Sequence, residues 1–403
     1  VSAWAKANSS MSKVLEGVQN KLSIGLPYGA SSVSSAYQSK GLVADVQIGS
    51  AGEEVVSLPY LNAIENIAVW SIAEQYRLCE EGKYEEAFAQ GISTARMLRQ
   101  LCDRDMAAEK FVAFRLLGEC LSVQRDIMWS YRDKISAEIF RKFATKEYPF
   151  LQPGDNERMK RLEMPEGDLK VAETILVEVF DADGDPVPSK MSSVFGMMQS
   201  QDAPFTRFGA SRRWELLATV HGSQTATQEK LTEVYDDWWR RWRIRQYDPI
   251  QALPTEFSRI NEIRYAVVVE SVSDMKEMFE ARNRLIVQIN GTVLSAGLCG
   301  YYSENGRWPN DLEKAYVKYI PKRFNFDPFD KAYGQFLFKY LGSRDAAVDT
   351  EYGRIEASGC MLYARGEDNS DENASESSLD GSTGDMVVWP ALRAVAREQG
   401  LLN

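Results

Sequence analysis

The chain has 403 residues, with 47 Lys and Arg against 58 Asp and Glu, a formal net charge of −11 and a single histidine, His221. This acidic balance disfavours a nucleic-acid partner, because binding to polyphosphate depends on Lys and Arg displacing condensed counterions. One histidine excludes every metal site or relay that needs two imidazoles, including the HExxH metalloproteases. The length predicts two or three domains with ample chain to bury a core.

No run of about 18 apolar residues occurs, so the sequence predicts no bilayer-spanning segment. The chain begins at Val1 instead of Met, which suggests that a targeting segment or membrane anchor has been removed or that the chain is truncated. The five cysteines have no CxxC spacing, and most lie beside apolar neighbours, which predicts buried thiols; a disulfide between two of them stays open. They are Cys79, Cys102, Cys120, Cys299 and Cys360.

Residues 1–57 are rich in Ser and Gly and show few helical repeats, which predicts an extended arm. Over residues 58–147 apolar side chains recur at three- and four-residue spacing, as in Ile64, Ile67 and Ala68, which predicts an antiparallel helical bundle. Residues 148–224 are broken by prolines and predict a connector with one helix or strand.

Residues 225–272 predict helices that include a Trp- and Arg-rich segment, and residues 273–403 predict a long helix from about 274 to 303 followed by a β module with an acidic loop. The expected fold class is therefore α+β, mainly α, with an N-terminal helical bundle, a long helix and a small C-terminal antiparallel β-sheet.

The Trp- and Arg-rich segment has the most unusual composition in the chain. Trp238 and Trp242 are four residues apart and share one helix face, and Arg241 and Arg245 lie on an adjoining stripe. Trp239 belongs to the same segment. Such a surface would suit contact with lipid headgroups, an anionic glycan or a protein partner. The alternative is a helix whose Trp face packs inside the bundle while its arginines pair with acids on neighbouring elements.

Four short motifs follow one another in the last third of the chain: YYSENGRWP at 301–309, DPF at 327–329, CMLYARGED at 360–368 and GDMVVW at 384–389. In order and spacing they resemble the C-terminal part of type II secretion major pseudopilins, over roughly residues 274 to 390. The chain departs from that family because it has no hydrophobic N-terminus of the prepilin kind, carries Asp330 where the family has glycine, and has a longer last loop.

The resemblance implies that the last loop binds calcium. Carried over by position, it points to Asp368 and Asp385 as carboxylate ligands and to Arg365 as a carbonyl donor, and we include Asp371 from the same loop. Calcium takes six to eight oxygens, and a loop with seven acids can supply them. The alternative is a solvated, mobile, Ser-rich loop without metal.

The whole chain is also similar to a group of planctomycete envelope proteins, in which a helical domain precedes a pseudopilin-like end. The residues that carry this similarity are the segment LPYLNA at 58–63, GKYEEA at 82–87 and the turn GRWP at 306–309. It implies a location in the cell envelope, periplasmic or membrane-associated.

No catalytic constellation is visible in the sequence. His221 stands in a VHGS segment without a GxSxG elbow, and the DADGD segment at 181–185 lacks the later residues of an EF-hand loop, so we expect a turn at each. We therefore expect no catalytic residues and no cofactor apart from calcium. The expected function is a non-enzymatic scaffold subunit that binds protein partners or further copies of itself, with peripheral membrane contact or a lost anchor. The alternatives are a metal- or carboxylate-dependent hydrolase of an envelope polymer and a glycan- or lipid-binding module.

Overall fold

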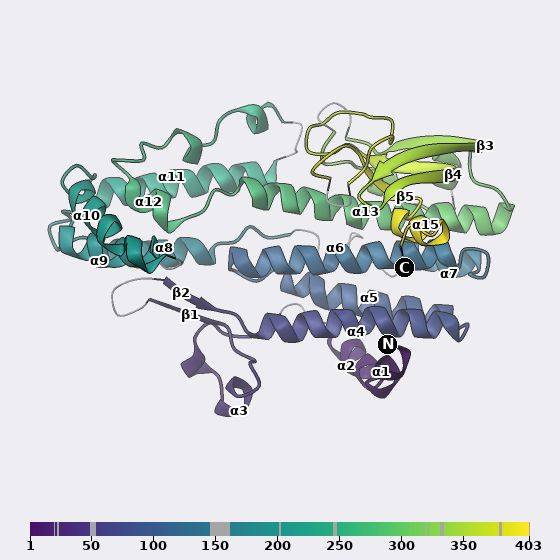
Figure 1. Cartoon of the computed structure of the whole chain (residues 1–403), viewed down its shortest axis with the longest axis horizontal. Coiled ribbons are helices and arrows are strands. Elements are labelled where there is room, and N and C mark those ends of the chain that lie inside the picture. The colour runs from purple at the N-terminus through teal and green to yellow at the C-terminus, as the bar shows by residue number, and fades with distance from the viewer. Residues whose placement is uncertain are drawn as a thin grey trace.

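The computed structural model confirms a mainly α-helical α+β chain with a small antiparallel sheet near its C-terminus. Figure 1 shows long helices running along the long axis of an elongated molecule, with the sheet at one end. Among the described residues, none of the helices combines the length and the apolar composition that a bilayer span needs. The structure describes residues 1–19, 21, 24–48, 54–145, 162–200, 203–244, 248–316, 318–320, 322–330, 334–378 and 381–402.

The N-terminal segment folds into short elements that pack on the bundle, which corrects the predicted extended arm. The buried residues are Ala5 in the first helix and Leu15 in the second, and the Trp70 indole donates to the Ala5 carbonyl at 3.0 Å. Apolar residues do recur at three- and four-residue spacing in the second helix, at Met11, Val14, Leu15 and Val18, so the sequence carried this helical period and the prediction overlooked it. The elements are α1 (Ser2–Ala7), α2 (Met11–Val18), η1 (Ala30–Ser32), α3 (Ser35–Gln38) and the antiparallel pair β1 (Asp45–Ile48) and β2 (Glu54–Ser57).

The next region consists of helices whose apolar faces pack against one another, as their periodicity predicts. Their core includes Phe88, Leu98 and Leu117, each no more than 4% exposed. A buried polar network attaches the N-terminal segment here: the Glu109 carboxylate accepts from the hydroxyls of Tyr28 and Tyr60 and pairs with the Arg104 guanidinium. The helices are α4 (Tyr60–Glu80), α5 (Tyr84–Leu101), α6 (Ala107–Ser130) and α7 (Ala137–Thr145).

The described residues of the proline-rich region, 162–200 and 203–224, form the α-helices α8 (Gly167–Val179), α9 (Pro188–Met198) and α10 (Arg207–Ala218), and not the one helix or strand that the prolines predicted. Pro188 is the first residue of α9, and Pro204 begins the short η3 (Pro204–Thr206) that leads into α10. A proline at the first helical turn removes no internal hydrogen bond, so these prolines start helices and do not break them.

The predicted long helix is α13 (Lys276–Asn305), which packs against α6 and α7. It ends where Gly306 adopts a left-handed conformation with φ of 65°, as the Asn-Gly pair predicts. Glycines on α13 let neighbours approach closely: a Cβ at Gly297 would lie 1.9 Å from Ile320 Cγ1. The elements before α13 are α11 (Gln224–Arg243), η4 (Pro249–Ala252), η5 (Phe257–Arg259) and α12 (Ala266–Ser271), and α14 (Glu313–Tyr316) and η6 (Lys322–Phe324) follow it.

The C-terminal module is a three-stranded antiparallel sheet in the order β3-β4-β5, with a final helix beside it. Its buried side packs on α13, where Val388 contacts the position of Gly291, and on α6, where the rings of Trp129 and Trp389 are 5.3 Å apart. The elements are β3 (Leu337–Thr350), β4 (Gly353–Ala364), β5 (Met386–Trp389) and α15 (Leu392–Glu398).

Candidate functional site

The loop between β4 and β5 brings several carboxyl groups together beside the sheet. Asp385, which immediately precedes β5, is fully buried, and its Oδ2 accepts from the Ala374 amide at 2.7 Å. Its other oxygen, Oδ1, and Glu372 Oε2 are both buried and make no hydrogen bond within the described residues. Two carboxylate oxygens of one loop are therefore out of contact with solvent and lack donors.

Burial raises the pKa of Asp385 to about 7; the hydrogen bond from the Ala374 amide opposes this rise, and the negative charges of Glu372 and Asp371 add to it. A carboxyl with this environment holds its proton near neutral pH. The same crowding of negative charge would favour a bound cation, so the loop can respond either by protonation or by binding a cation.

The structure brings together only part of the predicted calcium set. Asp371 lies close enough to affect the pKa of Asp385, and its Oδ1 accepts from the Asn373 amide at 2.9 Å and from the Tyr363 hydroxyl at 3.2 Å. Asp368 instead caps its own turn, with its Oδ1 accepting from the Ser370 amide at 2.9 Å. In the part of the chain that the structure describes, no three His, Cys, Asp or Glu side chains form a group that could hold a metal ion.

Arg365 and its neighbours hold the start of the loop. The Arg365 amide donates to Asp327 Oδ2 at 2.9 Å, and its guanidinium lies 3.8 Å from the Asp330 carboxylate. Asp327 is fully buried, its Oδ1 accepts from the Phe329 amide at 2.8 Å, and burial raises its pKa to about 7. Asp327 and Glu372 were not predicted as site residues, although the DPF motif did mark the turn that Asp327 organises.

The Trp- and Arg-rich segment forms the last part of α11, and its Trp238, Arg241 and Trp242 are buried. Trp238 packs against the Tyr235 ring at 5.1 Å, and the Trp242 indole donates to the Leu162 carbonyl at 2.7 Å. Trp239 is only half-buried, with the Arg243 guanidinium 4.2 Å from its ring centre. Arg245 lies outside the described residues. The face with Trp238 and Trp242 therefore packs inside the protein, as in the alternative interpretation of this segment as a packed helix and not a contact surface.

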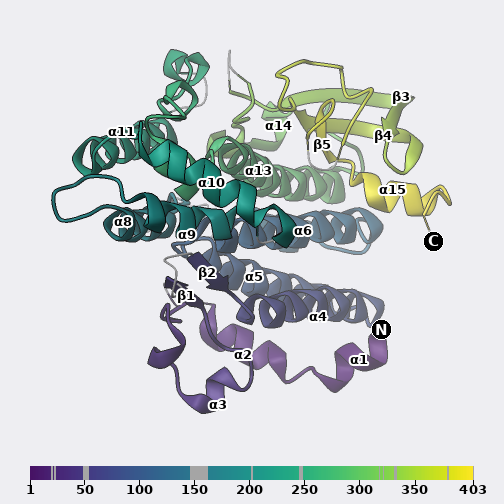
Figure 2. The ribbon, with the colours of Figure 1, turned by 60° about the vertical axis from the view of Figure 1, so that its left-hand side comes forward.

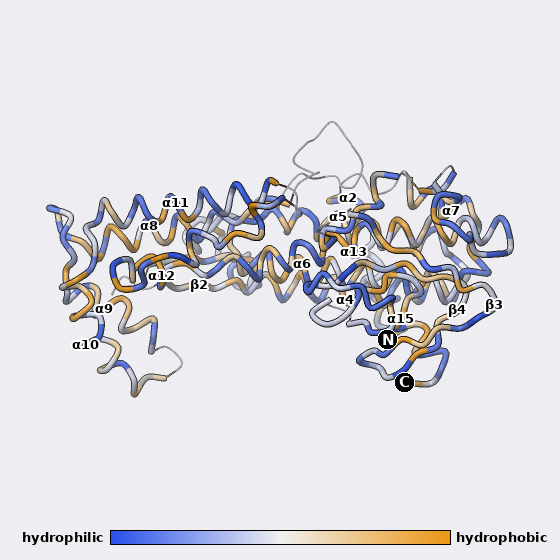
Figure 3. The backbone as a smooth tube through the Cα atoms, turned by 90° about the horizontal axis from the view of Figure 1, so that it is seen from above, coloured by the Kyte–Doolittle hydropathy of each residue, from blue (hydrophilic) through white to orange (hydrophobic). Residues whose placement is uncertain are grey.

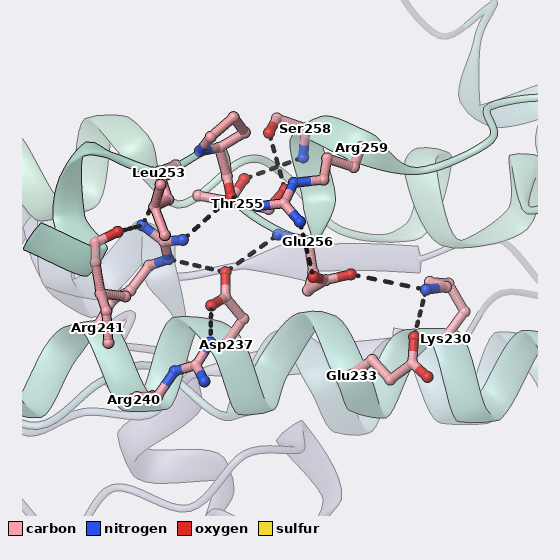
Figure 4. Close-up of polar contacts among 12 residues, drawn as sticks. Lys230, Glu233, Asp237, Arg240, Arg241, Leu253, Thr255, Glu256, Ser258 and Arg259 are labelled. Atoms are coloured by element: carbon pink, nitrogen blue, oxygen red, sulfur yellow. Dashed lines mark hydrogen bonds and ion pairs between the residues drawn. The ribbon is translucent and has the colours of Figure 1, made fainter.

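Arg241 is the centre of a buried polar cluster (Figure 4). Its Nε donates to Asp237 Oδ2 at 2.8 Å, and its other nitrogens donate to the carbonyls of Ile250, Leu253 and Pro254 at 2.8 to 3.2 Å. Burial alone would raise the pKa of Asp237, but hydrogen bonds from Arg240 and Arg241 hold it below its usual range. The guanidinium thus fixes the chain after α11 against the helix.

A cavity of about 400 Å³ lies between this cluster and the C-terminal module. Trp238, Phe279 and Phe329 provide its aromatic lining, and its acids include Glu280 and Glu367. The residues with a pKa raised to about 7, Asp327 and Asp385, do not line it. It has the size of a small-molecule site.

The DADGD segment forms the expected turn, and the segment with His221 leads from α10 into α11, where Ser223 is the N-cap. The His221 Nε2 accepts from the Val267 amide at 3.2 Å, its Nδ1 lies 2.9 Å from the Gly222 carbonyl, and burial lowers its pKa. Asp181 Oδ1 accepts from the amides of Asp183 and Asp185, which forms a tight turn.

All five cysteines are buried and unpaired.

Comparison with known proteins gives no relative from which a function could be carried over. No protein-family model matches the chain, and neither a curated protein nor a solved structure matches it.

Proposed function

We propose that the chain is a non-enzymatic structural or scaffold subunit of an envelope-associated protein assembly. The observation that supports this best is the role of its buried charges, which join distant parts of the chain. Asp126 of α6 is 1% exposed and pairs with Arg393 of α15, 267 residues further along the chain. Removing one partner of a buried ion pair strongly destabilises the folded protein, because it leaves a buried charge without a counterion. The Asp126–Arg393 pair therefore helps to hold the C-terminal module on the bundle.

The same arrangement extends along the paired long helices. The Arg125 guanidinium on α6 donates to Thr292 Oγ1 on α13 at 2.7 Å and also to the Gln288 side chain. At the other end, the Arg241 cluster fixes the segment after α11. The molecule is elongated (Figure 1), and buried polar contacts join its distant elements into one rigid unit. Such a unit is suited to holding protein partners at fixed distances from one another.

A cation in the loop between β4 and β5 is part of this proposal. Asp385 Oδ1 and Glu372 Oε2 would be its protein ligands, because they are buried and lack donors. Calcium needs six to eight oxygens, so these two supply only part of a site, and the set of Asp368, Asp371, Asp385 and Arg365 stays a prediction. A bound cation would order the loop and would take no part in a reaction.

The test is the assembly state of the full chain. Light scattering after size exclusion, repeated over a wide concentration range, should show a defined oligomer, or a stoichiometric complex should be recovered from an envelope fraction. A chain that stays monomeric at every concentration and recovers no stoichiometric partner contradicts the proposal.

A hydrolase of an envelope polymer is a second candidate, and the cavity beside Glu280 and Glu367 favours it. Paired carboxyl groups can act as acid and base on a glycosidic bond. Turnover of an envelope polysaccharide that is lost in Glu280→Gln and Glu367→Gln, but kept in a Glu65→Gln control, would replace the scaffold proposal with this one.

A further inference from the structure

Helix α10 is attached to the protein along one side only. Its buried residue Trp214 stacks on Phe195 of α9, with ring centres 4.2 Å apart. Close to this stack, Gly196 lets the Ser211 backbone approach so closely that a Cβ on Gly196 would lie 3.0 Å from Ser211 Cα. In Figure 2 α10 lies in front of the other helices, and Figure 3 shows α9 and α10 in a projection from one end of the elongated body. The opposite side of α10 therefore faces away from the protein.

That outward side carries large apolar residues that the fold does not bury. Phe208, Leu216 and Val220 are 82%, 61% and 58% exposed, and Phe205, just before the helix, is fully exposed. Residues four apart lie on one side of a helix, so Phe208, Arg212 and Leu216 form one stripe along α10, and Val220 lies in the turn just after the helix. Several large apolar side chains left exposed on one short stretch of chain indicate a contact surface and not a gap in the core.

The same helix is basic in an acidic protein. Arg207, Arg212 and Arg213 are exposed and form no ion pair within the described residues, and Glu215 is the one acid in α10. The whole chain has a net charge of −11. The unneutralised arginines beside exposed rings therefore complement a surface that is both anionic and able to take up apolar side chains.

We propose that the outward face of α10, together with Phe205, binds the surface of an anionic lipid bilayer. Charge complementarity favours an anionic bilayer, because the exposed arginines of α10 lie on the same helix as its exposed apolar side chains. At a bilayer surface the two kinds of side chain separate by depth: phenyl rings enter the acyl boundary while long arginine side chains reach back to the phosphates. The bilayer therefore satisfies both sets of groups.

The test uses the full chain and sedimentation with vesicles of phosphatidylcholine alone or mixed equally with phosphatidylglycerol. The chain should bind the mixed vesicles at low salt, bind them less at high salt, and fail to bind neutral vesicles. Replacing both rings, in Phe205→Ser with Phe208→Ser, should weaken binding at least about tenfold. Each of Arg212→Gln and Arg213→Gln should weaken it about fivefold.

Two controls separate a local effect from a general one. Ile263→Ser removes an exposed apolar side chain outside α10, and Lys13→Gln removes one exposed positive charge from α2. Both controls should bind like the parent chain, and all variants should keep its melting temperature, because none of the changed side chains is buried.

Two results overturn the proposal. One is no binding to mixed vesicles, and the other is equal binding by the parent chain and the Phe205 and Phe208 variant. If that variant instead changes the oligomeric state measured by light scattering, the face is a contact between protein copies and not a lipid site. This inference goes beyond the scaffold proposal: loss of vesicle binding with an unchanged assembly leaves the scaffold intact, and loss of assembly with unchanged binding leaves the lipid contact intact.

Discussion

Gly297 in the middle of α13 offers the sharpest test of how the C-terminal part packs. In an open helical position, replacing glycine by alanine stabilises a protein by about 1 kcal/mol, because alanine has the higher helix propensity. At Gly297 the new methyl group would lie 1.9 Å from Ile320 Cγ1 and 2.7 Å from its Cδ1, and Ile320 is 2% exposed. Overpacking of this kind costs about 1 to 3 kcal/mol. We expect Gly297→Ala to lower the free energy of unfolding by about 1 kcal/mol overall.

A matched control is present on α6. Gly118 is also helical, but its nearest neighbour for a new methyl group is Gln288 Cγ at 3.7 Å, which is an ordinary contact. Gly118→Ala should therefore stabilise the chain by about 0.5 to 1 kcal/mol. The free energies come from urea unfolding followed by circular dichroism, with the slope of the transition compared between variants.

The double variant Gly297→Ala with Ile320→Ala decides whether the clash is the cause. Ile320→Ala alone should cost about 2 to 5 kcal/mol, because it leaves a cavity. In the double variant the methyl group on residue 297 partly fills that cavity, so its cost should be at least about 1 kcal/mol below the sum of the single changes. If Gly297→Ala is as stabilising as Gly118→Ala, the segment before residue 321 does not lie against α13 and the packing is refuted.

Three further outcomes follow from the buried carboxyl groups. The folded state keeps the proton of Asp385 up to about pH 7, whereas the unfolded chain loses it near pH 4, so the free energy of unfolding falls as pH rises through this window. In urea unfolding, the stability of Asp385→Asn relative to the parent chain should therefore rise by about 2 kcal/mol between pH 5 and pH 8. A difference that stays constant with pH contradicts this. Glu109→Gln should cost about 3 kcal/mol and make residues 1–57 the first target of limited proteolysis, whereas Glu65→Gln, on an exposed ion pair, should change neither. Calcium at a hundred times its dissociation constant should stabilise the parent chain by about 2.7 kcal/mol over EDTA, with the gain lost in Asp385→Ala and in Glu372→Ala; no gain in the parent chain leaves the loop without a metal role.

The sequence was sufficient for those parts of the fold in which a helix carries a long apolar stripe. The helix expected over 274–303 is found at Lys276–Asn305, and its end follows from the Asn-Gly pair. The prolines of residues 148–224 led to a wrong prediction of a connector, because some of them begin helices, as Pro188 does in α9. The full extent of β3 (Leu337–Thr350) could not be read from the sequence, because its second half lies largely outside the core and shows no regular alternation of apolar residues.

The candidate site was harder to predict, because burial of a charge depends on partners that are distant in sequence. The DDWWRRWRIR segment suggested either a surface or a packed helix, and what decides is that the carbonyls of residues 250–254 fold back onto Arg241. Similarly, one of the chain's 58 acidic residues, Glu109, becomes buried because Tyr28, 81 residues earlier, reaches it. Periodicity describes a single element and contains no information on such pairs.

The contacts of Asp126 show why the C-terminal module is best regarded as part of one body with the bundle. Contacts join the two sides of the boundary predicted at residue 273. Helix α13 packs against α6 and α7, and Arg393 pairs with Asp126. Burial raises the pKa of Asp126 even with arginines beside it, so without α15 this carboxylate would lose its partner in a setting that disfavours its charge. Stability of the bundle and order of the module are therefore linked through α6 and α13. In contrast, α10 is held mainly by α9, which lets a surface contact form at that end without disturbing the braced core.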